Sequence, residues 1–159
     1  MQEKTDGFSL IELLIVVAII LIIAAIAIPN LLRSKIAANQ ASAVQSLRTI
    51  ITNEVIYSTT YNQGYTSNLA QLGPPTSGLP SSSAAGLLDS VLASGTKSGY
   101  SFPFVAVAPF NGSTPAYAVQ ANPLTPGVTG QNYYYGDSTG VIRQNTSATA
   151  TPSDSPIGG

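Results

Sequence analysis

The unbroken apolar run from Leu13 to Ile28 constrains the fold of this chain more than any other feature. It consists only of Leu, Ile, Val and Ala, and the next charged residue is Arg33. A helix needs about 20 residues of this kind to cross the hydrocarbon core of a bilayer. Because a chain in lipid must satisfy its backbone hydrogen bonds internally, we expect one membrane-spanning helix here.

A secretory signal peptide and a plain single-pass anchor are two other interpretations of this run. The apolar region of a signal peptide spans roughly 7–15 residues, and the run here is longer. A plain anchor explains the apolar residues but gives Glu12 no role. A carboxylate costs roughly 2.5–3.5 kcal/mol at the centre of a membrane span, and less near its end. Glu12 therefore indicates a specific partner for the carboxylate.

The residues around Glu12 form a short pattern, in which Gly7 is followed by Phe8-Ser-Leu-Ile-Glu12 and then by the apolar run. This pattern resembles the class III signal of type IV pilins and of the related pseudopilins, and the resemblance extends to about Ile51. It implies that residues 1–7 are a leader. In that family a prepilin peptidase cuts after the glycine, here between Gly7 and Phe8, and methylates the new amine of Phe8.

The resemblance also assigns Phe8 and Glu12 to assembly, because this glutamate pairs in the family with the N-terminal amine of a neighbouring subunit. An α-amino group has a pKa near 7.7–8.0 and is at least partly cationic at neutral pH. Inside a dry helical bundle a lone charge is costly, whereas a paired charge is much less so. The alternative is that Glu12 is only a favourable charge in the first turn of a helix.

Pro29 ends the apolar run and is expected to kink the helix, since proline removes one backbone hydrogen bond. Beyond it, apolar residues recur mostly at helical spacing: Leu32, Ile36, Val44, Leu47, Ile51 and Val55. We therefore predict one helix from Ser9 to Tyr57. Its hydrophobic part, residues 8–29, would lie in the membrane and then in a filament core, and its amphipathic part, residues 30–57, would pack on a globular head.

The head is predicted to contain a loop, a sheet and a tail. Residues 58–99 are rich in Gly, Pro, Ser, Thr and Asn, with short helices expected at 67–73, capped by Ser67, and at 84–94. Residues 100–144 read as an antiparallel sheet with four strands: 100–108, 116–121, 131–135 and 141–144. Residues 145–159 are Ser/Thr/Pro-rich and are predicted to form a tail that is either flexible or laid along the head surface. The fold class is α+β and type IV pilin-like: a long N-terminal helix packed on a small antiparallel sheet.

Two local features of the predicted sheet have more than one interpretation. Tyr133, Tyr134 and Tyr135 are expected to bury one ring in the sheet and expose two phenols, and a surface-adhesive or subunit-contact role is the alternative. Asp137 is expected to belong to a hairpin turn that ends at Gly140. Major pseudopilins bind calcium in their C-terminal loop, but only Asp137 and Asp154 fall in that region here, whereas calcium takes six to eight oxygens.

Composition narrows the classes of function. The chain contains neither Cys nor His, so disulfides, thiol nucleophiles and imidazole sites are excluded. Only seven acidic residues occur, and we expect no enzymatic activity, no cofactor and no metal site. The net charge of -1 argues against a nucleic-acid interface, which needs clustered Lys and Arg.

The resemblance implies a structural subunit, the major pilin of a type IV pilus, that forms a homopolymer through its N-terminal helix. The alternatives are a pseudopilin of a type II secretion system and a membrane-anchored binding protein. The implied partners are the prepilin peptidase, an inner-membrane assembly platform with its motor, an outer-membrane pore, and membrane lipid before assembly. The precursor would be a single-pass inner-membrane protein, and the filament would be extracellular.

Overall fold

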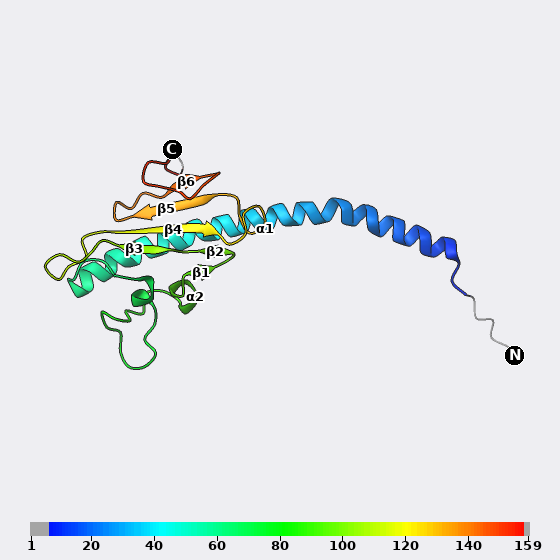
Figure 1. The fold of residues 1–159 in the computed structure, drawn as a ribbon. Coiled ribbons are helices and arrows are strands. Elements are labelled where there is room, and N and C mark those ends of the chain that lie inside the picture. Colours follow the sequence, from blue (N-terminus) through cyan, green and yellow to red (C-terminus); the bar gives the residue numbers. More distant parts are fainter. Residues whose placement is uncertain (1–6, 158–159) are drawn as a thin grey trace. The chain divides into compact units, whose positions relative to one another are not determined.

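The computed structural model describes residues 7–157 and divides at Lys35 into two units, which are described separately (Figure 1). Helix α1, Leu10–Tyr61, has 52 residues and runs through both units. It begins one residue after the predicted start and ends four residues after the predicted end. Residues 1–6 of the predicted leader and residues 158–159 of the predicted tail lie outside the described residues.

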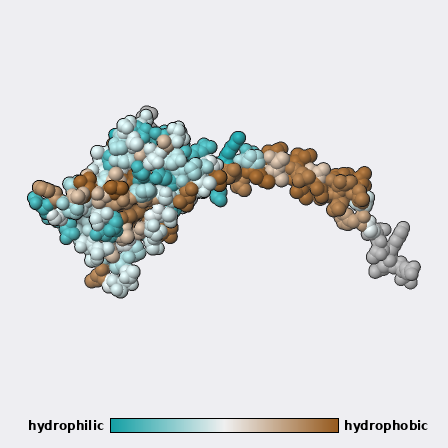
Figure 2. All heavy atoms as spheres, in the orientation of Figure 1, coloured by the Kyte–Doolittle hydropathy of each residue, from teal (hydrophilic) through white to brown (hydrophobic). Residues whose placement is uncertain are grey.

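In the first unit, α1 exposes its apolar side chains. Leu13, Leu21 and Ile28 are 59%, 63% and 66% exposed. Figure 2 shows an almost continuous hydrophobic surface along this part of the chain on the face in view. By length and composition α1 is able to cross a membrane. Pro29 lies inside α1 and does not end it, while the kink at Pro29 stays a prediction.

In the second unit, α1 packs one face against the head. Its buried residues are Ile36, Ala43, Ser46, Leu47, Ile50, Glu54 and Tyr57. Five of them recur at alternating steps of four and three, as expected for one face of a helix: Ala43, Leu47, Ile50, Glu54 and Tyr57. The predicted stripe was wrong at its C-terminal end, since Val55 is 50% exposed and Glu54 is buried. Two hydrogen bonds from Thr66 satisfy the Glu54 carboxylate inside the head, which allows this residue and not Val55 to lie on the buried face.

The head contains one antiparallel sheet, which confirms the α+β class. Its strands are β1 Thr96–Lys97, β2 Tyr100–Ser101, β3 Phe104–Ala106, β4 Tyr117–Pro123, β5 Tyr133–Asp137 and β6 Arg143–Asn145. The strand order is β1-β2-β4-β5-β6, and β3 also pairs with β4. Alternate residues of β4, from Tyr117 to Pro123, are buried. This central strand therefore supplies much of the core beneath α1.

The predicted strand at 100–108 is divided into β2 and β3. Pro103 lies at the break and has no N–H to donate to a neighbouring strand. Its carbonyl still accepts a hydrogen bond of 3.0 Å from the Gln120 N–H. Both pieces pair with β4, so the divided strand keeps its place in the sheet.

The tyrosine cluster is more buried than expected. Tyr134 and Tyr135 are 4% and 8% exposed, and Tyr133 is half-buried. Tyr135 pairs with Gln120 across β4 and β5, and the Gln120 amide donates to the carbonyl of Ala150. The C-terminal segment thus lies on the side of the sheet that Tyr135 faces. Tyr134 instead belongs to the core, where its ring centroid is 6.2 Å from that of Tyr100. Tyr133 is therefore the least buried of the three.

Both short helices before the sheet differ from their predictions. The 3-10 helix η1, Leu69–Leu72, is capped by Asn68, whose side chain accepts from the Gln71 N–H, and not by Ser67. Helix α2, Ser90–Ala93, is much shorter than the predicted 84–94. The N–H groups of residues 85, 87 and 88 donate to carbonyls of Gln71 and Leu72, so this stretch is not available for a helix.

The C-terminal segment is bonded to the head as far as residue 157, so of the two predicted alternatives the flexible tail is wrong for this part of the chain. Ala150 is fully buried. The Gln144 N–H donates to the Ser155 carbonyl at 3.0 Å, and the Ile157 N–H donates to the Ile142 carbonyl at 2.9 Å. A segment with its backbone hydrogen bonds made in this way is part of the folded head.

Candidate functional site

The predicted processing site lies immediately before α1. Gly7 and Phe8 are in non-helical backbone, and Phe8 is 85% exposed. A Cβ atom built on Gly7 would meet no other atom within 4 Å. The peptide bond between these two residues is therefore accessible in the free chain, and cleavage at that bond stays a prediction.

Glu12 lies in the exposed first turn of α1 and caps the helix. The Ser9 N–H donates to Glu12 Oε2 at 3.0 Å, and the Leu13 N–H donates to the Ser9 carbonyl at 3.2 Å. Ser9 and Glu12 thus follow the Ser-x-x-Glu pattern of a capping box, in which the glutamate reaches back to the cap residue. The first-turn role is thus present in the free chain, and it uses one oxygen of the carboxylate.

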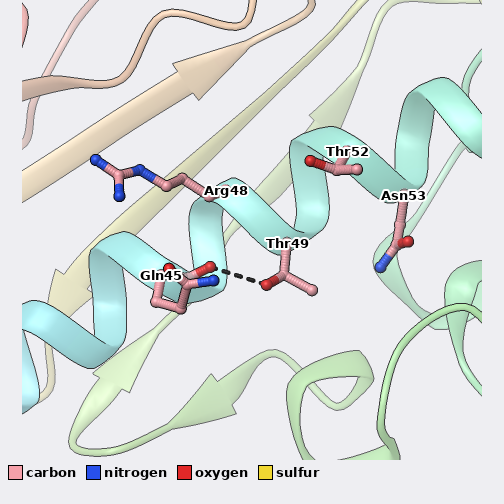
Figure 3. A pocket seen from close by; sticks show the side chains of 5 residues that line it. All are labelled: Gln45, Arg48, Thr49, Thr52 and Asn53. Atoms are coloured by element: carbon pink, nitrogen blue, oxygen red, sulfur yellow. Dashed lines mark hydrogen bonds between the residues drawn. The ribbon is translucent and has the colours of Figure 1, made fainter.

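A shallow pocket of about 200 Å³ lies along the second half of α1 (Figure 3). Its lining comes entirely from α1: Gln45, Arg48, Thr49, Thr52 and Asn53. Thr49 Oγ1 donates to the Gln45 carbonyl, and Asn53 Nδ2 donates to the Leu87 carbonyl. The pocket offers hydrogen-bonding groups and one positive charge, but its lining holds no acid–base pair.

The two carboxylates that were considered as calcium ligands, Asp137 and Asp154, accept hydrogen bonds from residues of their own loops. Asp137 Oδ1 accepts from the Thr139 N–H at 2.9 Å, and the Gly140 N–H donates to the Asp137 carbonyl at 3.0 Å. Gly140 has a φ of 79°, as expected at the end of this turn. Asp154 accepts from the Thr151 N–H at 2.7 Å. Among residues 7–157, no group of three or more Asp or Glu side chains is placed to hold a metal ion.

Glu54 is a buried carboxylate that sequence reasoning missed. It is fully buried on the packed face of α1 and accepts hydrogen bonds from the N–H and the hydroxyl of Thr66. Burial raises the pKa of Glu54, and the two hydrogen bonds from Thr66 partly oppose this effect. The spacing of Glu54 from Ile50 and Tyr57 was the signal that places it on the buried face.

Comparison with known proteins agrees with the N-terminal pattern. Residues 4–28 match the family described as the prokaryotic N-terminal methylation motif. The type IV wide pilus major component PilA4 of Thermus thermophilus is 44% identical over 71 residues, which make up 45% of this chain and 53% of that protein. The type IV major pilin protein PilA of Myxococcus xanthus is 52% identical over 51 residues, which make up 32% of this chain and 23% of that protein.

The matched regions thus span about half of one curated relative and about a quarter of the other. No solved structure shows significant similarity to the chain. The chain carries the prokaryotic N-terminal methylation motif of type IV prepilins and is homologous to type IV major pilins.

Proposed function

We propose that this chain is the major pilin of a type IV pilus, a structural subunit that polymerises with itself through the apolar part of α1. The observation that carries this proposal is the exposure of that part in the free chain, with Leu21 and Ile28 both more than 60% exposed. Apolar surface of this extent marks a membrane or protein interface. Lipid covers it before assembly, and other copies of the chain cover it afterwards.

Processing by a prepilin peptidase links these two states. The peptidase cleaves between Gly7 and Phe8 and methylates the amine of Phe8. The methylation motif over residues 4–28 and the accessibility of this bond support the proposal. Glu12 of an incoming subunit then pairs with the amine of a neighbour, while Pro29 bends α1 at the end of the apolar run.

The resemblance to type IV pilins supports the remaining partners and locations of this proposal. The precursor spans the inner membrane once, and an assembly platform with its motor transfers it to the filament. The filament passes an outer-membrane pore and is extracellular. In this setting the chain is a building block and not an enzyme.

Intact-mass spectrometry and electron microscopy of sheared surface material test the proposal. We expect the mass of a chain that begins at N-methylated Phe8, and long filaments that contain it. A mass that retains Met1, or cleavage elsewhere, would contradict the processing and favour a membrane-anchored binding protein. Correct processing with filaments only on overexpression would instead indicate a pseudopilin of a type II secretion system.

A further inference from the structure

A hollow of about 320 Å³ lies in the head, between the loop after β4 and the segment after β6. Its polar lining consists of Gln131, Asn132, Tyr133, Thr146 and Ser147. The volume is at the lower end of the range for small-molecule sites, roughly 300–1,000 Å³. None of the lining residues carries a charge. The hollow thus has room for one small ring and no group to neutralise an ion.

The floor of the hollow is held from two sides. With the Gln40 amide oriented so that its oxygen faces the loop, that oxygen accepts from the N–H groups of Gln131 and Asn132 at 3.2 and 3.1 Å. The hydroxyl of Tyr100 donates to the Asn132 carbonyl at 2.9 Å. Gln40 belongs to α1 and Tyr100 to β2, so two elements hold Asn132 in place, and Gln40 also holds Gln131.

The rim is also formed before any ligand binds. On one side the Gly127 N–H donates to the Gly130 carbonyl at 2.8 Å. On the other side Asn145 Oδ1 accepts from the Ser147 N–H at 2.9 Å, and Asn145 pairs with Tyr133 across β6 and β5. A preformed site loses little conformational entropy on binding.

Three side chains at the hollow have unused hydrogen-bonding capacity. The side chains of Gln131, Tyr133 and Thr146 form no hydrogen bond to another residue within the described part of the chain, and none of the three is buried. A carboxamide both donates and accepts, as does each hydroxyl, and the tyrosine ring also offers an apolar face. A neutral ring with several hydroxyl groups and one apolar face has the complementary chemistry.

We propose that this hollow binds one neutral pyranose ring of a glycan. The ring of Tyr133 covers the apolar face of the sugar, and Gln131 and Thr146 bond to its hydroxyl groups. A sugar acid is disfavoured because its carboxylate finds no positive charge in the lining. This role is additional to filament formation, and it uses the one accessible phenol of the tyrosine cluster.

Saturation-transfer NMR on the full chain, in a zwitterionic detergent without a sugar headgroup, tests the site. The probes are the methyl glycosides of glucose, galactose and N-acetylglucosamine, with glucuronic acid as the charged comparison. We expect saturation transfer to at least one neutral glycoside and none to glucuronic acid. Absence of transfer to all three neutral probes, or equal transfer to glucuronic acid, would overturn the proposal.

Variants locate the binding. Gln131→Ala and Tyr133→Leu are each expected to raise the Kd of the bound glycoside about tenfold, because each removes one anchoring contact. Gln45→Ala is the matched control, since Gln45 is also exposed but lies on α1 outside the hollow. A Kd that changes equally in the control, or in none of the variants, would contradict this site. Because the assay uses unassembled subunits, its result does not depend on filament formation.

Discussion

The carboxylate of Glu54 and the backbone N–H of Thr66 are joined by a hydrogen bond of 2.9 Å inside the head, and the Thr66 hydroxyl bonds to the same carboxylate. Thr66 is 1% exposed and belongs to the connection that follows α1. The hydroxyl of buried Tyr117, on β4, has no hydrogen-bond partner among the described residues. Glu54 thus fastens the connection to the helix at the cost of a buried charge.

This buried charge predicts a pH-dependent stability. Because burial raises the pKa of Glu54 above its usual 4.5, the folded head binds the proton more tightly than the unfolded chain does. Glu54 therefore contributes stability below the unfolded pKa, and this contribution is lost as the pH rises through the folded pKa. Glu54→Gln keeps a hydrogen-bond acceptor but no charge. We therefore expect the Tm of this variant to increase relative to the Tm of the wild type as the pH rises.

Thermal unfolding of both proteins over about pH 4–8 measures this difference. The difference in Tm between the two proteins is compared, and not the Tm of one protein, because Asp89 changes the stability of both with pH in the opposite direction to Glu54. The pKa of Asp89 is lowered by the Leu92 N–H and by Lys97, so its contribution to stability is lost as the pH falls. A difference in Tm between the two proteins that does not change with pH would contradict the role given to Glu54.

The packed face of α1 predicts a large effect at Leu47. This side chain is fully buried in the core. We expect Leu47→Ala to lower the free energy of unfolding by about 2–5 kcal/mol, through lost burial and the cavity left behind. Leu124→Ala is the matched control, since Leu124 is 57% exposed, and should change it by less than about 0.5 kcal/mol. Equal losses in urea denaturation would show that α1 does not form the core described here.

Gly64 is predicted to be irreplaceable for two separable reasons. Its φ is 75°, and a Cβ atom would lie 2.2 Å from the carbonyl oxygen of Thr114. Gly78 has a φ of 83° but open space around it, so Gly78→Ala tests the backbone conformation alone. That conformation costs about 1–2 kcal/mol. We expect Gly64→Ala to lower the free energy of unfolding clearly more than Gly78→Ala does in the same denaturation experiment. Equal losses would show that the close contact between residue 64 and the Thr114 carbonyl does not matter.

Substitution of Glu12 separates its capping role from its proposed role in assembly. Glu12→Gln keeps an acceptor for the Ser9 N–H, whereas Glu12→Leu keeps neither acceptor nor charge. We expect both variants to be processed to Phe8 and both to fail to form filaments, because the amine of the neighbour has no anionic partner. Mass spectrometry and electron microscopy read the two steps separately. Normal filaments from Glu12→Gln would show that the charge is dispensable.

The sequence predicts the long helix and the fold class well because both depend on local patterns. The apolar run and the helical spacing after Pro29 are visible without any tertiary contact. The buried face was less predictable, because Val55 is more hydrophobic than Glu54 and yet Glu54 is the residue inside. Its partner, Thr66, comes from the following connection, and no spacing rule identifies such a pair.

The head was predictable in outline and not in detail. The stretch 100–108 was predicted as one strand, and only the pairing of both pieces with β4 shows that it is divided at Pro103. The proposed glycan site combines Gln40 with Gln131, which are far apart in the chain. A pattern in either segment alone does not predict that they meet, so the hollow was visible only in the folded structure.

The fastening of the C-terminal segment has a consequence for maturation. Ala150 and the bond from Ile157 to the Ile142 carbonyl hold this segment without any covalent link, since the sequence contains no cysteine. The closure therefore needs no oxidant and no thiol–disulfide isomerase to complete it. A reducing agent is therefore expected to leave the head folded, and its closure is limited by folding and not by disulfide formation.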